Sequence, residues 1–389
     1  MPYGNKPVIA LTGATGFLGS HLMASLLTKG YSIIVLGRPA KNESLKERIK
    51  RLLSWFGIES WSDQVTCIDA DLSQNNLGIA DGEYSRLCAT VGSVIHCASD
   101  TSFAESKREK VMAVNVNNLK GILDFSRNAQ VSFFHYISTA YVAGAGVTFC
   151  REILSSSKSF TNVYEESKAA AENIISRYCQ KNSINLSIIR PSIVYGDSQT
   201  GRSLKFNALY FPLRSAQSIR DIYLNDIGRN GGLKAAKNGI YIDKDGYLFL
   251  PLRIYLPGEG NLNIIPVDYF VDAAIKIIES SSRSGIYHLT NNAPTTMKIV
   301  ADYYGQLMKV RGVEIIYGPQ PENILRNPAE ELFDRFIGPY RPYLSDNRVF
   351  DTTNSSLATD NLKPPGFTYE IFKTCMEYAI RVNWGESIF

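Results

Sequence analysis

The sequence predicts an α/β protein built on a doubly wound parallel sheet, and three observations support this prediction. Short apolar runs rich in β-branched residues alternate with longer segments of helical periodicity, as in strand–helix–strand units. The runs are continuously apolar, which is typical of strands that helices cover on both faces. A glycine-rich turn directly follows the first run. The predicted strands are 8–12, 32–37, 65–69, 93–96, 133–138 and 186–190.

The turn after the first predicted strand has the pattern of a dinucleotide-binding loop. Gly13, Gly16 and Gly19 leave out side chains where backbone N–H groups and a helix N-terminus must meet a pyrophosphate. A glycine-rich turn without a ligand is the alternative, but its place between a strand and an amphipathic helix favours a Rossmann-type cofactor site. The cofactor contacts expected in this turn are Gly13, Thr15, Gly16, Phe17, Leu18 and Gly19.

The end of the second predicted strand favours NADP(H) as the cofactor. An NAD enzyme usually has an acidic residue here for the ribose 2′-hydroxyl, whereas this chain has Arg38, which suits a 2′-phosphate. Arg48, in the helix that follows, is a weaker second candidate for the same phosphate. An exposed arginine that does not contact the cofactor is the alternative.

Later strand ends supply the remaining expected cofactor contacts. Asp71 and Leu72 follow the third strand and are placed to meet the adenine, although Asp71 equally suits a turn or a helix cap. Residues after the fourth strand are expected to pass beneath the cofactor, and two residues after the sixth strand complete the set. These further contacts are Cys97, Ala98, Ser99, Pro191 and Ile193.

Three residues have the arrangement of a catalytic triad. Thr139 follows the fifth strand, and the spacing of Tyr164 and Lys168 puts both on one face of the next predicted helix, where they also meet the cofactor. A free tyrosine titrates near pH ~10, and a neighbouring ammonium lowers that pKa. Thr139 can add a hydrogen bond to the oxygen that becomes negative as hydride arrives. An exposed i,i+4 pair is the alternative for the two helix residues, but their combination with Thr139 and the glycine loop favours catalysis.

Two nearby residues leave alternatives open. Neighbouring residues of a strand face opposite ways, so only one of Ser138 and Thr139 can face a substrate. Asn115 lies in the helix before the fifth strand and could anchor a proton relay through water, as part of the catalytic set. A simple structural role is the alternative for Asn115.

The alternation of predicted strands and helices stops after about residue 201. A loop-rich excursion from the sheet is expected where Gly, Asn and Lys accumulate. A strand–helix–strand pattern returns between 263 and 289, and a proline-rich remainder follows. We therefore expect a Rossmann domain for NADP(H) and a smaller, mainly helical C-terminal substrate lobe. The Rossmann domain comprises 1–205 and 260–292, and the substrate lobe comprises 206–259 and 293–389.

Composition excludes several other classes. The net charge of +4 is dispersed over 41 basic and 37 acidic residues, without the clustered Lys and Arg of a nucleic-acid binder. The six cysteines and four histidines lack metal-ligand spacing, which predicts no metal site and reduced thiols in a cytoplasmic protein. No segment approaches the ~18 apolar residues of a membrane span. The N-terminal seven residues lack the features of a signal peptide, so a soluble protein is expected.

With these residues in place, the chain resembles the extended short-chain dehydrogenases/reductases. Within them it is similar to the thioester reductase and fatty acyl reductase branch, with a male-sterility-type NAD-binding domain. The similarity covers most of the chain, and the segments 190–201 and 266–269 separate this branch from most sugar epimerases. The matching stretches are 36–39, 69–72, 77–78, 94–103, 115–116, 162–168, 190–201 and 266–269.

The resemblance implies NADPH-dependent reduction of an acyl thioester to an aldehyde. The acyl group would be carried by the phosphopantetheine arm of a carrier protein or by coenzyme A. Hydride attack gives a thiohemiacetal held by Thr139 and Tyr164, and a second hydride could carry the aldehyde on to the alcohol. No adenylation or carrier domain accompanies these motifs, so a carrier-bound substrate is expected to arrive in trans. The excursion at 220–250 and the proline-rich lobe match the branch less clearly, which leaves the substrate and the oligomeric state open.

Two other functions are compatible with the sequence. A conventional extended short-chain dehydrogenase or epimerase would use the same triad on a hydroxyl, ketone or nucleotide-sugar, without releasing a thiol. A non-catalytic NADP-binding sensor or scaffold would not require Thr139, Tyr164 and Lys168 together.

Overall fold

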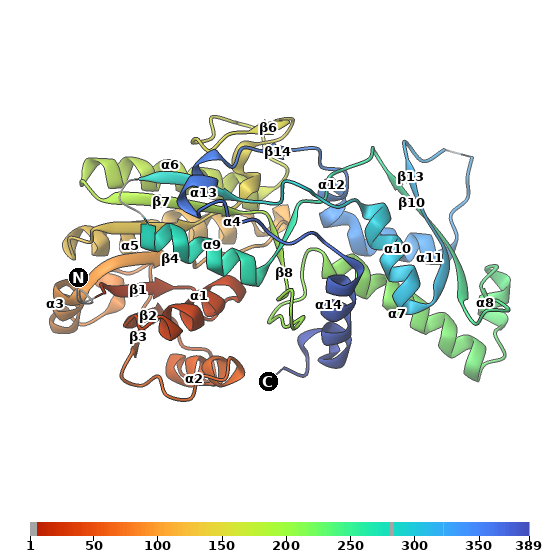
Figure 1. Ribbon diagram of the computed structural model, residues 1–389, viewed down its shortest axis with the longest axis horizontal. Coiled ribbons are helices and arrows are strands. Elements are labelled where there is room, and N and C mark those ends of the chain that lie inside the picture. The colour runs from red at the N-terminus through yellow and green to blue at the C-terminus, as the bar shows by residue number, and fades with distance from the viewer. Residues whose placement is uncertain (1–5, 281–283, 322, 389) are drawn as a thin grey trace.

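A seven-stranded parallel sheet forms the centre of the protein in a computed structural model that describes residues 6–280, 284–321 and 323–388 (Figure 1). Its strand order is β12-β7-β5-β4-β1-β2-β3, which confirms the predicted doubly wound α/β fold. Residues 1–5, to which the expectation about a signal peptide applies in part, lie outside the described residues. The strands are β1 Val8–Thr12, β2 Ile33–Gly37, β3 Val65–Asp69, β4 Val91–His96, β5 Phe133–Ile137, β7 Asn185–Pro191 and β12 Gly285–Leu289.

Both faces of this sheet are buried, because successive strand residues point to opposite sides. In β1, Ile9 and Leu11 pack toward one helical layer and Ala10 packs toward the other. The first layer is α1 Phe17–Thr28, α2 Leu45–Trp55 and α9 Val267–Ser280. The second layer is α3 Asp81–Thr90, α5 Leu119–Asn128 and α6 Val163–Lys181, with α4 Arg108–Met112 leading into it. This two-sided burial explains why the strands appear as continuous apolar runs in the sequence.

A second cluster of helices surrounds a three-stranded sheet beyond the carboxyl ends of the main strands (Figure 1). Its helices are α7 Tyr210–Arg229, α8 Leu233–Lys237, α10 Met297–Met308, α11 Pro328–Ile337, α12 Arg341–Leu344 and α14 Tyr369–Arg381. Its sheet has the order β13-β10-β9, with strands β9 Tyr241–Ile242, β10 Leu248–Leu256 and β13 Val310–Tyr317. The division of the chain into two lobes at the expected boundaries stays a prediction.

The expectation of a loop-rich excursion after residue 201 is wrong for much of this region. α7 alone spans 20 residues, and its buried side chains recur every three or four positions, from Tyr210 through Leu213 and Ile219 to Tyr223. Pro212 lies in the first turn, where proline does not break a helix. The Gly, Asn and Lys residues that suggested a loop lie at the end of α7, within α8 and in the short connections around α8.

The C-terminal part of the chain returns to the main sheet before it ends in α14 (Figure 1). β14 Val349–Phe350 pairs with β6 Phe149–Cys150, and α13 Thr353–Ala358 packs beside β12 and α9. A further two-stranded sheet joins β8 Ile193–Tyr195 to β11 Ile264–Pro266. Segments distant in sequence therefore meet above the carboxyl ends of β5 and β7.

Membrane-spanning helices and clusters of metal-binding side chains are both absent from the described residues. No helix among residues 6–280, 284–321 and 323–388 is long and apolar enough to cross a membrane. The same residues contain no group of three or more His, Cys, Asp or Glu side chains placed to hold a metal ion, and all six cysteines are unbonded.

Candidate active site

The glycine loop between β1 and α1 requires glycine for steric reasons. Gly13 has a φ of +74°, and a Cβ on it would lie 2.6 Å from the backbone nitrogen of Ala98. A Cβ on Gly19 would lie 2.2 Å from the carbonyl oxygen of Gly13. Helix α1 follows Gly16 without a side-chain cap, so the backbone N–H groups of its first turn can serve a ligand. This cradle fits the pyrophosphate of a dinucleotide.

Hydrogen bonds hold the glycine loop against the end of β4. The Thr12 hydroxyl accepts from the backbone N–H of Ala98 at 3.3 Å and lies 2.8 Å from Nδ1 of His96. The backbone N–H of Cys97 donates to the carbonyl of Thr12 at 3.2 Å. The expected contacts after β1 and β4, up to Ser99, therefore lie together at one edge of the sheet.

The residues expected to meet the adenosine end lie together beyond β2 and β3. Arg38 is exposed, and Nη1 of Arg48 donates to its carbonyl oxygen at 3.1 Å. Asp71 accepts from both the backbone N–H and the hydroxyl of Ser73, which lowers the pKa of Asp71, with a smaller contribution from Arg38. Asp71 thus has the turn role that was one of its two alternatives, while its contact with adenine stays a prediction. Leu72 packs partly buried against the second core layer.

A cavity of about 300 Å³ lies between the glycine loop, the end of β5, α6 and the second cluster of helices. The site residues predicted from the sequence that line it are Gly16, Phe17, Leu18, Gly19, Cys97, Ser99, Thr139, Tyr164, Lys168, Pro191 and Ile193. Its opposite wall was not predicted and includes Phe103, Tyr141, Lys205, Leu209, Pro212, Leu262, Met297, Tyr340, Tyr343 and Leu344. Gly13, Thr15, Ala98, Arg38, Arg48, Asp71, Leu72 and Asn115 lie outside its lining.

Tyr164 and Lys168 project from the first two turns of α6. Asn162 begins this helix, because its side chain accepts the backbone N–H of Glu165 at 3.1 Å. Lys168 is buried and donates to the carbonyl oxygen of Ile137 at 2.8 Å, at the end of β5. Burial lowers the pKa of Lys168 to about 8, because it disfavours the charged form.

The expectation that Lys168 lowers the pKa of Tyr164 is wrong for this arrangement. Burial raises the pKa of Tyr164, and Cys97 and Glu165 raise it further. The ammonium of Lys168 donates to a backbone carbonyl instead of to the phenol, so its charge does not offset the loss of solvent around Tyr164. The tyrosine is therefore a neutral hydroxyl that can donate a hydrogen bond or a proton.

Ser138 and Thr139 both line the cavity, but their hydroxyls have different partners. The Ser138 hydroxyl donates to Oε1 of the buried Glu172 at 2.6 Å. Thr139 lies next along the chain, and its hydroxyl accepts the backbone N–H of Tyr141 at 3.4 Å. The bond of Ser138 to Glu172 favours Thr139 as the hydroxyl that meets a substrate, and this role stays a prediction.

The contacts of Asn115 favour its structural alternative. Its side-chain oxygen accepts from the Ser99 hydroxyl at 3.1 Å and from the backbone N–H of Asp100 at 2.8 Å. Its side-chain nitrogen donates to the carbonyl of Asp100 and to the hydroxyl of Ser167, both at 2.9 Å. An amide has two donors and two acceptor sites, so this one is saturated and joins the segment after β4 to α6. It has no remaining capacity to order a relay water.

Aromatic side chains form the part of the cavity wall that sequence reasoning missed. The ring of Phe103 lies 5.9 Å from that of Tyr164, 5.6 Å from Tyr340 and 5.5 Å from Tyr343. The Tyr343 hydroxyl donates to Oε1 of the buried Glu165 at 2.7 Å, which fixes this distant segment on α6. The signal in the sequence was the pair of tyrosines three residues apart among prolines at 338–344.

Comparison with known proteins places this geometry in a family. The family model described as male sterility protein matches residues 11–274, which is well over half of the chain. A linear gramicidin synthase protein of Brevibacillus parabrevis is 28% identical over 404 aligned positions, covering 98% of this chain and 7% of that protein. Human fatty acyl-CoA reductase 2 is 26% identical over 228 positions, covering 49% of this chain and 44% of that protein. The chain thus spans less than half the length of these curated relatives.

A solved structure agrees in fold. The terminal R domain from the myxalamid PKS-NRPS biosynthetic pathway superposes with a TM-score of 0.73 at 20% sequence identity, covering 98% of this chain and 92% of that one. The family match includes the glycine loop, Thr139, Tyr164 and Lys168. The chain belongs to the family described as male sterility protein.

Proposed function

We propose that the protein is an NADPH-dependent reductase that converts an acyl thioester to an aldehyde and can carry the aldehyde on to the alcohol. The observation that supports this most directly is the cavity that joins the glycine loop to Thr139, Tyr164 and Lys168. A cofactor held by the loop and a carbonyl held by the hydroxyls would meet in that space. The cavity lies between the proposed cofactor domain and the proposed substrate lobe.

The side chains suit stabilisation of a developing alkoxide. Bound NADPH would supply a hydride to the thioester carbon. Tyr164, as a neutral hydroxyl, donates a hydrogen bond and then a proton to the carbonyl oxygen, while Thr139 donates a second hydrogen bond. The thiohemiacetal then breaks its C–S bond, and the thiol leaves with the proton of the hydroxyl. The balance is thioester plus hydride plus proton giving aldehyde plus thiol.

Lys168 contributes by charge and by position. Its ammonium lies in the cavity wall and is anchored on the carbonyl of Ile137, one residue before Ser138. A positive charge near Tyr164 favours negative charge on the oxygen that the phenol contacts. We therefore assign Lys168 to cofactor binding and to stabilising the negative charge that develops on the substrate oxygen.

The far wall of the cavity indicates an apolar acyl group. Leu209, Pro212, Leu262, Met297 and Leu344 face this space, together with the aromatic rings already described. Such a wall would exclude water from the thioester carbon. We propose that the acyl group arrives on the phosphopantetheine arm of a carrier protein or on coenzyme A.

The proposal is tested by supplying NADPH with a panel of acyl-coenzyme A and acyl-phosphopantetheine thioesters. Free thiol, aldehyde and NADPH are followed together. We expect one thiol for each aldehyde formed, and thiol release in step with the first equivalent of NADPH. Turnover of ketones or nucleotide-sugars without thiol release would instead support the dehydrogenase or epimerase alternative.

Arg38→Ala is expected to weaken NADPH binding by at least about tenfold and to leave NADH binding nearly unchanged. Arg38 is exposed beyond β2, where a guanidinium can pair with a 2′-phosphate that NADH lacks. Fluorescence titration of both dinucleotides measures the two Kd values. Arg51→Ala on α2, an arginine paired with Glu43, is the matched control. Equal losses for both dinucleotides in Arg38→Ala would contradict the assignment.

A further inference from the structure

A buried ion pair lies directly behind the candidate active site, outside the cavity. Arg190 in β7 and Glu172 in α6 are 2% and 0% exposed, and their closest charged atoms are 2.6 Å apart. Burying two charges is costly unless every donor and acceptor finds a partner. The hydrogen bonds of Arg190 and Glu172 explain how the protein accommodates two buried charges at this position.

All five N–H groups of Arg190 are used. Nε and Nη2 donate to the two carboxylate oxygens of Glu172 at 2.9 and 2.6 Å. Nη1 and Nη2 also donate to the carbonyls of Arg151 and Ile153 at 3.3 and 2.9 Å. The last N–H of Nη1 meets Nε2 of His288 at 3.2 Å. Burial and Arg190 lower the pKa of His288 to about 4, so this ring is neutral and can accept.

The ion pair contacts Ser138, the residue before Thr139, through one short hydrogen bond. The Ser138 hydroxyl donates to Oε1 of Glu172 at 2.6 Å. One turn earlier on the same helix, Lys168 donates to the carbonyl of Ile137. Two side chains of α6 thus hold two successive residues at the end of β5, and this fixes which face Thr139 presents.

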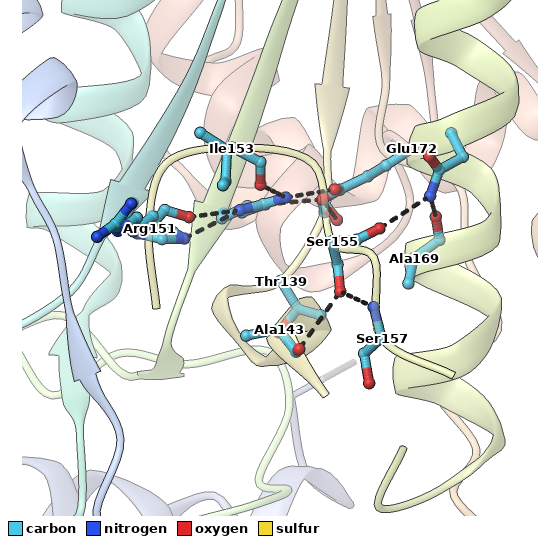
Figure 2. Close-up of polar contacts among 12 residues, drawn as sticks. Thr139, Ala143, Arg151, Ile153, Ser155, Ser157, Ala169 and Glu172 are labelled. Carbon is cyan, nitrogen blue, oxygen red and sulfur yellow. Dashed lines mark hydrogen bonds and ion pairs between the residues drawn. The ribbon is translucent and has the colours of Figure 1, made fainter. Parts of the chain in front are cut away.

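The pair also reaches the segment that follows Thr139. We call residues 151–157 the strap; Figure 2 shows Ser155 between Ala143 and the helix that carries Ala169 and Glu172. The Ser155 hydroxyl donates to the carbonyl of Ala143 at 3.3 Å, and Arg190 holds the carbonyls of Arg151 and Ile153. The turn of residues 140–143 begins with Thr139, so it is anchored from this side as well.

We propose that Glu172 and Arg190 form a positioning unit for Thr139, acting through the Ser138 hydroxyl and the strap. The two residues do not line the cavity, so they do not meet the substrate. Their effect is to hold Thr139 where its hydroxyl meets the carbonyl oxygen. This inference rests on the proposed role of Thr139 in thioester reduction.

A double-variant cycle tests the link between Ser138 and Thr139. Thr139→Ala is expected to lower kcat about 100-fold, as loss of one oxyanion donor does. Ser138→Ala is expected to lower kcat about tenfold with KM for NADPH unchanged, because a small displacement of a catalytic group is costly. In Thr139→Ala, adding Ser138→Ala is expected to have no further effect. Ser126→Ala removes a different buried hydroxyl, which donates to the backbone carbonyl of Ile122; it is the control and is expected to keep wild-type kcat.

The outcomes separate this inference from the proposed function. A normal kcat for Ser138→Ala, or the same fold-loss with and without Thr139, would overturn the positioning role while thiol release still supports the reductase. A normal kcat for Thr139→Ala would overturn the assignment of Thr139 and the inference with it. Absence of thiol release by the wild-type protein would overturn the proposed function and the role of Thr139 in it, whereas the link between Arg190 and the strap is tested without turnover.

Limited proteolysis tests the strap independently of turnover. Arg151 is the first residue of the strap and Lys158 directly follows it; both are exposed trypsin sites, and Lys298 on α10 serves as a reference site. Arg190→Lys keeps a charge for Glu172 but has too few donors in the right geometry to hold two carbonyls. We expect strap cleavage several-fold faster relative to cleavage after Lys298. An unchanged ratio would overturn the link between Arg190 and the strap.

Discussion

Tyr164→Phe is expected to lower kcat for thioester reduction by about 100- to 10,000-fold, the range for loss of a general acid. Tyr164 lies in the cavity wall beside Lys168, and burial keeps its hydroxyl protonated. The variant removes an interaction that strengthens only as charge develops, so Kd for NADPH is expected to stay nearly unchanged. Steady-state rates at saturating thioester and a separate titration of NADPH measure the two quantities.

Tyr178→Phe is the matched control for this prediction. Tyr178 lies on the same helix, and its hydroxyl donates to Asp124 at 2.6 Å, away from the cavity. Wild-type turnover is expected for this variant. Undiminished turnover in Tyr164→Phe would show that another group protonates the carbonyl oxygen, and Tyr164 would then not be the general acid.

The sequence predicted the main sheet well because one physical cause acts along the whole strand. Helices on both faces require continuous apolar runs, and 8–12 matches β1 residue for residue. The glycine loop was predictable because Gly13 and Gly19 have no room for a Cβ. These features depend on neighbours in sequence or on a single close approach.

Features that depend on distant segments were not predictable from the same patterns. Tyr343 reaches Glu165 across 178 positions, and only the folded chain brings the two together. The saturation of Asn115 and the raised pKa of Tyr164 likewise follow from contacts and burial that no local motif encodes. The roles of the predicted site residues therefore stay predictions until the variants are measured.

Glu172→Ala is expected to lower the free energy of unfolding by about 3–5 kcal/mol, the usual cost of leaving one member of a buried ion pair alone. Arg190 would keep its charge at 2% exposure and lose the two carboxylate oxygens that neutralise it. Urea denaturation of wild type and variant measures the difference from the midpoint and slope. Asp302→Ala breaks a pair whose side chains are both 63% exposed, and it is expected to change stability little.

The charge itself, and not the volume of the side chain, accounts for most of this cost. Glu172→Ala combined with Arg190→Met removes the unpaired charge, and it is expected to recover part of the lost stability although it lacks the bonds to the strap. The recovery is incomplete because the carbonyls of Arg151 and Ile153 then lose their donor. A double variant less stable than Glu172→Ala would mean that these carbonyls, and not the isolated guanidinium, dominate. In that case the pair would stabilise the protein chiefly by holding the strap, and the loss of Ser138's partner would be the smaller part of its effect.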